Sequence, residues 1–236
     1  MRKNHNAKVT AKTFLPKEEY IEMLSMKSNE VSISKSNGKT GSCCNDLAFP
    51  TVTCREDAPC KLNGQCYCMH GMQTTSNVQQ AYLRNLRLYN TDIEDFWQQI
   101  EFKVRHCPMP LFRFFDCGDF PNQEFVKGSC LLAKKFPEIK FLAYTKHYEW
   151  VNEYLDQGGE IPDNYVIRFS MWHNQWKVPN PHNLPVAWVD FKDKTLNPDF
   201  PKNCVSCANQ LDKTITCSTC RICWKKNIQN VKFKQH

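Results

Sequence analysis

Cysteine is the residue type in this sequence whose number and spacing are typical of bound metal. The chain has 236 residues and 14 cysteines, six of them between positions 43 and 68 and five between 204 and 223. No stretch of about 18 apolar residues is present to span a membrane, and no apolar run follows the N-terminus as in a secretory signal. We therefore expect a cytoplasmic protein without a membrane segment. In that reducing compartment, metal ligation explains the thiols better than disulfides do.

The first group of cysteines centres on Cys54, Cys60 and Cys66, which are separated by five residues each. Pro59 and Gly64 favour a loop that folds back, so that the three thiolates face one inorganic core. Three ligands leave one iron of a cluster open for reaction, whereas a fourth thiolate closes the cluster. The candidates for that fourth ligand are Cys68, Cys43 and Cys44. The spacing lacks the short knuckles that zinc sites usually have.

The second group has two interpretations. Its members are Cys204, Cys207, Cys217, Cys220 and Cys223. Two Cys-x2-Cys knuckles would supply the four thiolates of a zinc ribbon. The Cys-x2-Cys-x2-Cys run over 217–223, with Cys204 or Cys207 as a distant fourth ligand, is instead typical of a ferredoxin-like 4Fe-4S site. The spacing alone leaves both open.

Three cysteines, Cys107, Cys117 and Cys130, lie apart from both groups. Single cysteines in apolar surroundings usually behave as small core side chains. We expect most of these three to have that role rather than to bind metal.

Hydrophobic periodicity predicts alternating strands and helices through the centre of the chain. Helices are predicted from residue 76 onward, from a capping box at Thr91-Asp92-Ile93-Glu94, at 122–136 and at 147–155. Strands are predicted at 31–34, 111–115, 139–145, 165–170 and 186–191. Such alternation implies a parallel sheet with right-handed crossovers, and the chain is too short for eight complete barrel units. The predicted fold is α/β, an incomplete (β/α) barrel or open parallel sheet with cysteine-rich metal-binding segments at both ends.

The same patterns divide the chain into four parts. They are an N-terminal extension with the first strand (1–42), a cysteine cluster loop (43–75), an α/β core (76–200) and a C-terminal cysteine metal-binding module (201–236). The formal net charge of +7 comes largely from lysine and arginine in the first twelve and last thirteen residues. Nucleic acid is therefore a weakly supported partner, because a recognition surface concentrates its charge on one folded face.

Polar residues follow several predicted strands at the edge where parallel α/β folds place their ligand sites. Asp116 and Asp119 follow the strand at 111–115, and Lys146 follows the strand at 139–145. We predict catalytic roles for these three, and cofactor-binding roles for Gly118 and Ser170 at the same edge. The alternative is that the carboxylates only cap the next helix and pair with basic neighbours.

Several motifs in one order resemble the phage "gene product 88" domain family over about residues 30–236. The motifs are Thr53-Cys54…Cys60…Cys66-Tyr67, the segment from Phe112 to Phe120, the segment from Ala133 to Thr145, and Cys217-x2-Cys220-x2-Cys223-Trp224 followed by Asn230-Val231-Lys232-Phe233 and His236. The family pattern has alanine, histidine and serine where this chain has Cys68, Phe115 and Cys117. These extra thiols imply a larger or additional metal centre.

The family is similar in outline to radical S-adenosylmethionine enzymes, which pair a three-cysteine cluster loop after the first strand with a partial barrel. The resemblance implies an iron–sulfur protein of a phage or mobile element, with 4Fe-4S clusters, S-adenosylmethionine as a candidate cofactor and a redox protein as a candidate partner. The predicted metal ligands are Cys54, Cys60, Cys66, Cys68, Cys204, Cys207, Cys217, Cys220 and Cys223.

Two other functions compete with an iron–sulfur redox or radical-type enzyme. One is a zinc-stapled binding module with affinity for nucleic acid. The other is a structural or storage iron–sulfur protein without turnover. The sequence does not identify a substrate, the type and number of clusters, the roles of Cys43, Cys44 and Cys68, or the oligomeric state.

Overall fold

A computed structural model describes residues 30–173 and 177–235 of the chain. The basic N-terminal residues that raised the question of nucleic acid, Arg2, Lys3, Lys8 and Lys12, lie outside this range. None of the helices in the described ranges is long and apolar enough to cross a membrane.

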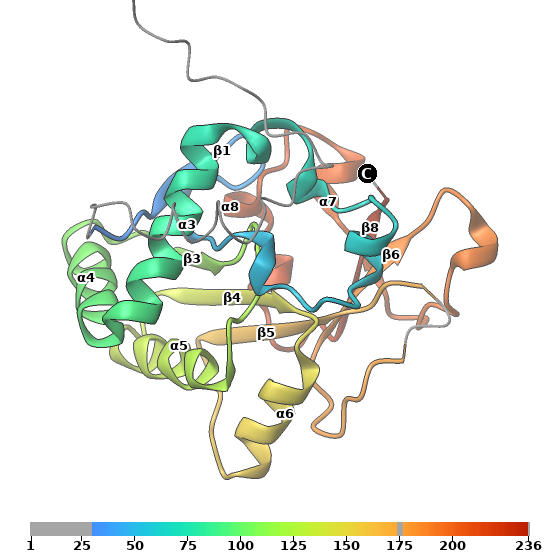
Figure 1. The fold of residues 1–236 in the computed structure, drawn as a ribbon. Helices are drawn as coiled ribbons and strands as arrows, with labels where there is room; N and C mark the ends of the chain where they lie inside the picture. Colours follow the sequence, from blue (N-terminus) through green and yellow to red (C-terminus); the bar gives the residue numbers. More distant parts are fainter. Residues whose placement is uncertain (1–29, 174–176, 236) are drawn as a thin grey trace, which may run out of the picture.

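The structure is an open sheet of eight strands with helices in the connections (Figure 1). The strands are β1 (Ser34–Asn37), β2 (Gly41–Leu47), β3 (Leu111–Phe114), β4 (Lys140–Thr145), β5 (Tyr165–Ser170), β6 (Val186–Asp190), β7 (Val205–Ser206) and β8 (Asn230–Lys234). The helices are α2 (Pro59–Leu62), α3 (Ser76–Thr91), α4 (Ile93–His106), α5 (Gln123–Lys135), α6 (Tyr148–Asp156), α7 (Ala208–Leu211) and α8 (Cys217–Cys220), and short 3-10 helices cover Thr51–Thr53, Tyr67–Met69, Gly71–Thr74, Lys194–Leu196 and Ile222–Trp224.

The spatial order of the strands is β1-β2-β3-β4-β5-β6-β8-β7. β1 forms an antiparallel hairpin with β2, and every other neighbouring pair is parallel. From β2 to β6 the spatial order follows the chain order, so each crossover moves one strand further in the same direction. The prediction of a mostly parallel α/β sheet is confirmed, in its open rather than its barrel form.

Alternation along the central strands gives the sheet two different faces. Phe112, Phe114, Phe141, Tyr165 and Ile167 point to one face and join the large aromatic core with Phe96 of α4, Phe125 of α5 and Val151 of α6. The residues between them point to the other face, where Leu111, Leu142 and Val166 contact Trp224 near the C-terminus. Figure 1 shows α4, α5 and α6 on one side of β3, β4 and β5, and α8 on the other side. The C-terminal cysteine segment therefore takes the place of a second layer of helices.

Most element predictions agree with the structure, and four differ. The first strand runs over 34–37 rather than 31–34, and Cys43 and Cys44 lie on β2 rather than in a loop. The helix α4 begins one residue later than the capping box implied, because the side chain of Asp92, not Thr91, accepts a hydrogen bond from the Asp95 amide. The strands β7 and β8 were missed within the cysteine-rich C-terminal module.

Candidate functional site

The two groups of cysteines line one cavity, although about 140 residues separate them in sequence. The cavity has a volume of about 500 Å³. It opens at the carboxyl ends of the parallel strands and continues across the face that the C-terminal segment covers. Its thiols are Cys54, Cys60, Cys66 and Cys68 from the segment after β2, and Cys207, Cys217, Cys220 and Cys223 from the C-terminal segment.

The front thiol group consists of Cys54, Cys60, Cys66, Cys68 and Cys117. Thiol hydrogen bonds connect Cys60 to Cys66, Cys66 to Cys68 and Cys68 to Cys117. The Cys54 thiol interacts electrostatically with Cys60 and Cys66. The loop folds back as predicted, since Gly64 has a φ of 63° and the Gln65 amide donates to the Cys60 carbonyl at 2.9 Å. Four of these thiols therefore line one wall of the cavity, and Cys117 is buried behind them.

Cys117 is the member of the front thiol group that the sequence analysis did not assign. Its side chain is 1% exposed and lies in the same buried cluster as Cys66 and Cys68. The expectation of a small core side chain holds for its burial but overlooks its thiol neighbours. A signal was present in the sequence, because Cys68 and Cys117 are both departures from the family pattern, and the structure places these two thiols in contact.

The turn that carries Cys117 has an unusual backbone. Phe115 is 3% exposed with a φ of 64°, a left-handed conformation that non-glycine residues seldom adopt away from functional sites. Gly118 has a φ of 79°, and a Cβ there would lie 2.6 Å from the Phe49 carbonyl oxygen. The Phe49 amide in turn donates to the Cys117 carbonyl at 3.1 Å. Gly118 is therefore required for close approach of two backbones beside the front thiol group.

The rear thiol group consists of Cys207, Cys217, Cys220 and Cys223. The Cys223 thiol interacts electrostatically with Cys207 and Cys220, and the Cys217 thiol with Cys223 and Cys207. Cys204 does not line the cavity, and the charged neighbour of its thiol is Lys232. The sequence left either Cys204 or Cys207 as the fourth ligand beside the cysteines of 217–223. In the structure Cys207 lies with them and Cys204 does not.

Arg168 of β5 holds the loop that carries Cys223 in place. Its side chain is fully buried on the sheet face opposite the aromatic core. The guanidinium donates to the carbonyls of Cys223 at 2.9 Å, Ile228 at 2.8 Å, Lys225 at 3.1 Å and Ile222 at 3.4 Å. A rigid fork with five donors suits several carbonyls at once.

The helix α8 is held from the side by the β1–β2 hairpin. The amides of Cys217 and Ser218 donate to the carbonyls of Lys39 at 2.9 Å and Thr40 at 3.0 Å. Gly41 of the hairpin has a φ of 77°, and a Cβ there would lie 2.7 Å from Ser218 Oγ. Cys44 lies in the same buried cluster as Cys217 and Cys223. Cys44 thus lies beside the rear thiol group and not beside the front one, where a fourth ligand was sought, and the backbone amide of Cys43 donates to Ser218 Oγ of α8 at 3.4 Å.

The remaining two central cysteines have separate surroundings. Cys130 is 2% exposed in the aromatic core, as expected for a small core side chain. Cys107 is exposed, and Lys35 Nζ lies 3.5 Å from its sulfur. The expectation of a core role is therefore wrong for Cys107, because it follows α4 where the chain turns into solvent before β3.

The donor set of both groups fits a soft metal centre, since thiolates select zinc, copper(I) and iron–sulfur clusters. In the described part of the chain, no three His, Cys, Asp or Glu side chains converge as they would around a single ion. Zinc–sulfur bonds of about 2.3 Å hold tetrahedral sulfur atoms roughly 3.8 Å apart. An iron–sulfur cluster contains several metal atoms and spans a wider set of cysteines. Burial raises the pKa of Cys217 to about 11 and also raises the pKa of Cys54, so metal binding at either wall must release protons.

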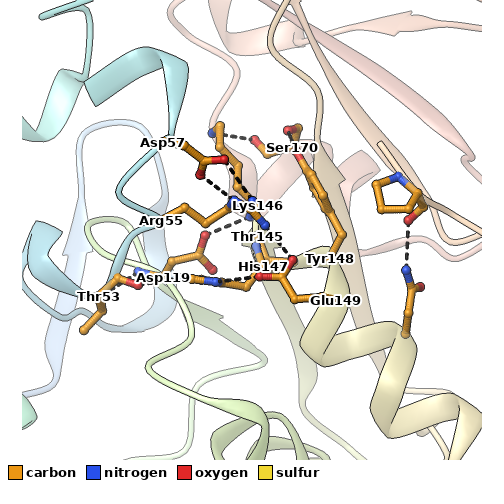
Figure 2. A network of polar contacts seen from close by, with 12 residues as sticks. Thr53, Arg55, Asp57, Asp119, Thr145, Lys146, His147, Tyr148, Glu149 and Ser170 are labelled. Atoms are coloured by element: carbon orange, nitrogen blue, oxygen red, sulfur yellow. Dashed lines mark hydrogen bonds and ion pairs between the residues drawn. The ribbon is translucent and has the colours of Figure 1, made fainter. Parts of the chain in front are cut away.

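The predicted polar residues line the same cavity as the thiols. Figure 2 shows three of them, Asp119, Lys146 and Ser170. Asp119 is 5% exposed, and its two carboxylate oxygens accept hydrogen bonds from the amides of Lys146 and Phe120, each at 2.8 Å. Burial raises the pKa of this carboxyl. Asp119 therefore connects the turns after β3 and β4, and it does not cap the next helix, whose N-cap is Asn122.

Lys146, Ser170 and Asp116 have more freedom to contact a ligand. Lys146 Nζ donates to Ser170 Oγ at 3.3 Å and lies 5.8 Å from the centre of the Trp172 ring. Asp116 is half-buried, and its carboxylate accepts from Gln73 Nε2 at 3.4 Å. All three side chains line the cavity. The structure thus brings the predicted residues together, and it leaves their catalytic roles as predictions.

His147 is a neighbour that the sequence analysis did not place in the site. Its ring is stacked on Trp150 with centroids 3.6 Å apart, and its Nε2 lies 2.8 Å from the Thr53 carbonyl oxygen (Figure 2). This contact ties the start of the front loop to the end of β4. Position after a predicted strand was the only signal for it in the sequence.

Comparison with known proteins bears on the family of the chain. No curated protein and no solved structure matches it. The sequence model of the family described as gene product 88 matches residues 2–226, which include both groups of cysteines and every strand of the sheet except β8. The chain therefore belongs to the gene product 88 family.

Proposed function

We propose that this protein is an iron–sulfur enzyme whose two thiol groups hold clusters on opposite walls of one cavity. The observation that carries the proposal is the convergence of eight thiols, from segments at opposite ends of the chain, on a cavity of about 500 Å³. A storage or purely structural cluster needs no such space beside it. A space of this size is typical of small-molecule sites.

The front thiol group would hold the cluster that reacts. Cys54, Cys60 and Cys66 would be its ligands, and an iron atom with no protein ligand would face the cavity. Cys68 and Cys117 contact each other behind Cys66, and either thiolate could instead be the fourth ligand that coordinates this iron atom. When bound, such a cluster supplies one-electron chemistry. The chain's own contribution is to hold the thiols, to exclude water by burying them, and to present Lys146, Ser170 and Asp116 to a ligand.

The rear thiol group would hold a second cluster through Cys207, Cys217, Cys220 and Cys223. Four thiolates complete the coordination of a 4Fe-4S cluster, so this centre would pass electrons rather than bind a substrate. Arg168 places positive charge beneath the Cys223 loop, which favours a centre with net negative charge. A redox protein is the partner that such a centre implies.

The test is the metal and sulfide content of anaerobically purified protein. We expect brown protein with iron and acid-labile sulfide, lowered in part by Cys60→Ser at the front and in part by Cys220→Ser at the rear. Cys107→Ser is the matched control, because its thiol is exposed and outside both groups. Stoichiometric zinc without labile sulfide would refute the proposal.

Loaded protein then permits a test of radical chemistry. Reduced protein is incubated with S-adenosylmethionine, and its cleavage products are measured in the wild type and in Cys60→Ser. Cleavage that depends on Cys60 supports a radical-type enzyme. If S-adenosylmethionine stays intact although the cluster is fully loaded, the protein is an electron carrier rather than a radical-type enzyme.

A zinc-stapled module is the second candidate function, and one observation favours it at the rear. Cys207 and the 217–223 run come from two separate segments, as the two knuckles of a zinc ribbon do. The metal analysis of Cys60→Ser distinguishes the cases, because a zinc-bearing rear group would leave colourless protein with about one equivalent of zinc.

A further inference from the structure

Lys146 is a cation in the cavity wall without a carboxylate partner. Asp119 is the nearest acidic residue by its contacts, but its oxygens accept from the backbone amides of Lys146 and Phe120. Among the residues that the structure describes, no ion pair within 4.0 Å involves Lys146 Nζ. A charge that is removed from bulk water without a partner is costly, so a site of this kind favours an anion.

The hydrogen-bond donors of Lys146 are only partly used. An ammonium has three N–H donors, and the one acceptor that contacts it is Ser170 Oγ at 3.3 Å. The Trp172 ring, 5.8 Å from Nζ, interacts with the charge but accepts no conventional hydrogen bond. Among the residues that the structure describes, no other hydrogen-bond acceptor contacts Nζ, and both Lys146 and Ser170 line the cavity. Figure 2 shows the contact between the two side chains.

Cationic side chains outnumber acidic ones in the cavity wall. Its cationic lining residues are Lys39, Arg113, Lys146, Arg221 and Lys234. Its acidic lining residues are Asp116 and Asp119. Because a concave site with low-dielectric walls focuses the field of its charges, the potential inside favours negative ligands.

We propose that this cavity binds a small anionic ligand whose carboxylate or phosphate group accepts hydrogen bonds from Lys146 Nζ beside Ser170 Oγ. The inference names the ligand class of the cavity and rests on the proposed function for the reaction that follows. The competing explanation is that Lys146 only offsets negative charge on Cys54 and Cys60, which are electrostatic neighbours of its ammonium. In that case no added anion would depend on Lys146.

The test is titration calorimetry of the full chain, purified anaerobically, with inorganic phosphate and separately with acetate at constant ionic strength. We expect one equivalent of at least one probe to bind, and the tighter probe identifies the group as phosphate or carboxylate. Lys146→Met should weaken binding about tenfold or more, since a charge-assisted hydrogen bond is lost. Lys134→Met is the matched control, because Lys134 is an exposed lysine on α5, and it should bind as the wild type does.

Two further variants separate the contributions of the positive charge and of the Ser170 hydroxyl to anion binding. Lys146→Arg retains the cation and should restore most of the affinity. Ser170→Ala leaves the ammonium beside the cysteines and should weaken binding roughly two- to tenfold through loss of the hydroxyl. The inference is overturned if the wild type binds neither probe at millimolar concentration, or if Lys146→Met and Ser170→Ala bind as tightly as the wild type.

Iron and sulfide are measured on each sample, so that the two proposals can fail separately. Binding that depends on Lys146 in protein without iron would refute the iron–sulfur proposal and leave the anion site standing. Protein with iron and sulfide but without Lys146-dependent anion binding would refute the anion site and leave the iron–sulfur proposal standing.

Discussion

Replacement of Arg168 by methionine tests whether the tertiary structure assembles the rear thiol group as described. Arg168 has no exposed surface, and its guanidinium donates to four backbone carbonyls of the 222–228 segment. Methionine fills similar volume on the sheet face but donates no hydrogen bond. The variant therefore removes the polar contacts and retains most of the apolar ones.

The expected loss follows from those contacts. Three of the four lie between 2.8 and 3.1 Å, within the range of good N–H···O bonds. Each hydrogen bond to a charged group contributes about 1.5–3 kcal/mol, and the contributions are not additive. Loss of a buried charged partner typically costs about 3–5 kcal/mol, and we expect the free energy that keeps this segment closed to fall by that amount. Opening of the segment should then increase roughly 150- to 5,000-fold.

Amide hydrogen exchange is the assay, with residues 222–228 compared with the 54–66 loop in the same sample. We expect exchange in 222–228 to accelerate strongly, with loss of the metal bound by the rear thiol group, while the front loop changes much less. Arg105→Met is the matched control, because the Arg105 side chain is 60% exposed and its pair with Glu101 is an i,i+4 contact on α4. Such a pair contributes only about 0.2–0.5 kcal/mol.

The reasoning is refuted if the exchange rate of residues 222–228 in Arg168→Met stays within threefold of the wild-type rate. Such a ratio corresponds to a change in the opening free energy on the order of RT. Equal acceleration of both segments would also contradict it, because that result means global unfolding rather than release of one loop. Arg168→Lys should give an intermediate result, since an ammonium reaches fewer carbonyls than the guanidinium fork.

Three further predictions use single side chains. Gly118→Ala should lower the free energy of unfolding by about 1–3 kcal/mol more than Gly64→Ala in urea titrations, because both glycines have positive φ but only a Cβ at Gly118 would meet backbone, at 2.6 Å; equal losses would contradict the contact with Phe49. If the front thiol group holds an iron–sulfur cluster as proposed, Cys117→Ser should retain the cluster but change its electron paramagnetic resonance spectrum, and an unchanged spectrum would exclude Cys117 from the surroundings of the cluster. Native protein treated with iodoacetamide at pH 8 should be modified at Cys107 and not at Cys130, because burial raises the pKa of Cys130 to about 12 and the thiolate is the nucleophile; peptide mapping reads both, and early modification of Cys130 would contradict its burial.

Local patterns predicted the central strands well where burial on both faces of the sheet produces a continuous run of apolar residues. The strand predicted at 165–170 has the same bounds as β5, because Tyr165 to Phe169 are all buried. The helix predicted at 122–136 is α5 with Asn122 as its N-cap, whose side chain accepts from the Phe125 amide at 2.9 Å. These elements depend on contacts a few residues apart, which a sequence pattern contains.

Local patterns were less informative where two signals compete or where a strand is short. Thr91 matched a capping box, yet its hydroxyl donates back to the Arg87 carbonyl at 2.9 Å and Asp92 becomes the cap. The strand β8 alternates apolar and charged residues and was hidden by the cysteine pattern before it. Its place beside β6 depends on partners more than 40 residues away.

The sequence by itself determined the chemistry that is available and the elements that carry it. Eleven thiols in two spaced groups, with strand and helix periods between them, predict ligands for a soft metal on a parallel sheet. Only the tertiary structure decided which other thiols lie beside these groups: Cys117 packs with Cys66 and Cys68 of the front group, Cys207 rather than Cys204 joins the rear group, and Cys44 lies behind the rear group. The reason is that parallel crossovers bring strand ends together irrespective of their separation in sequence, and the C-terminal segment then folds across the free face of the sheet.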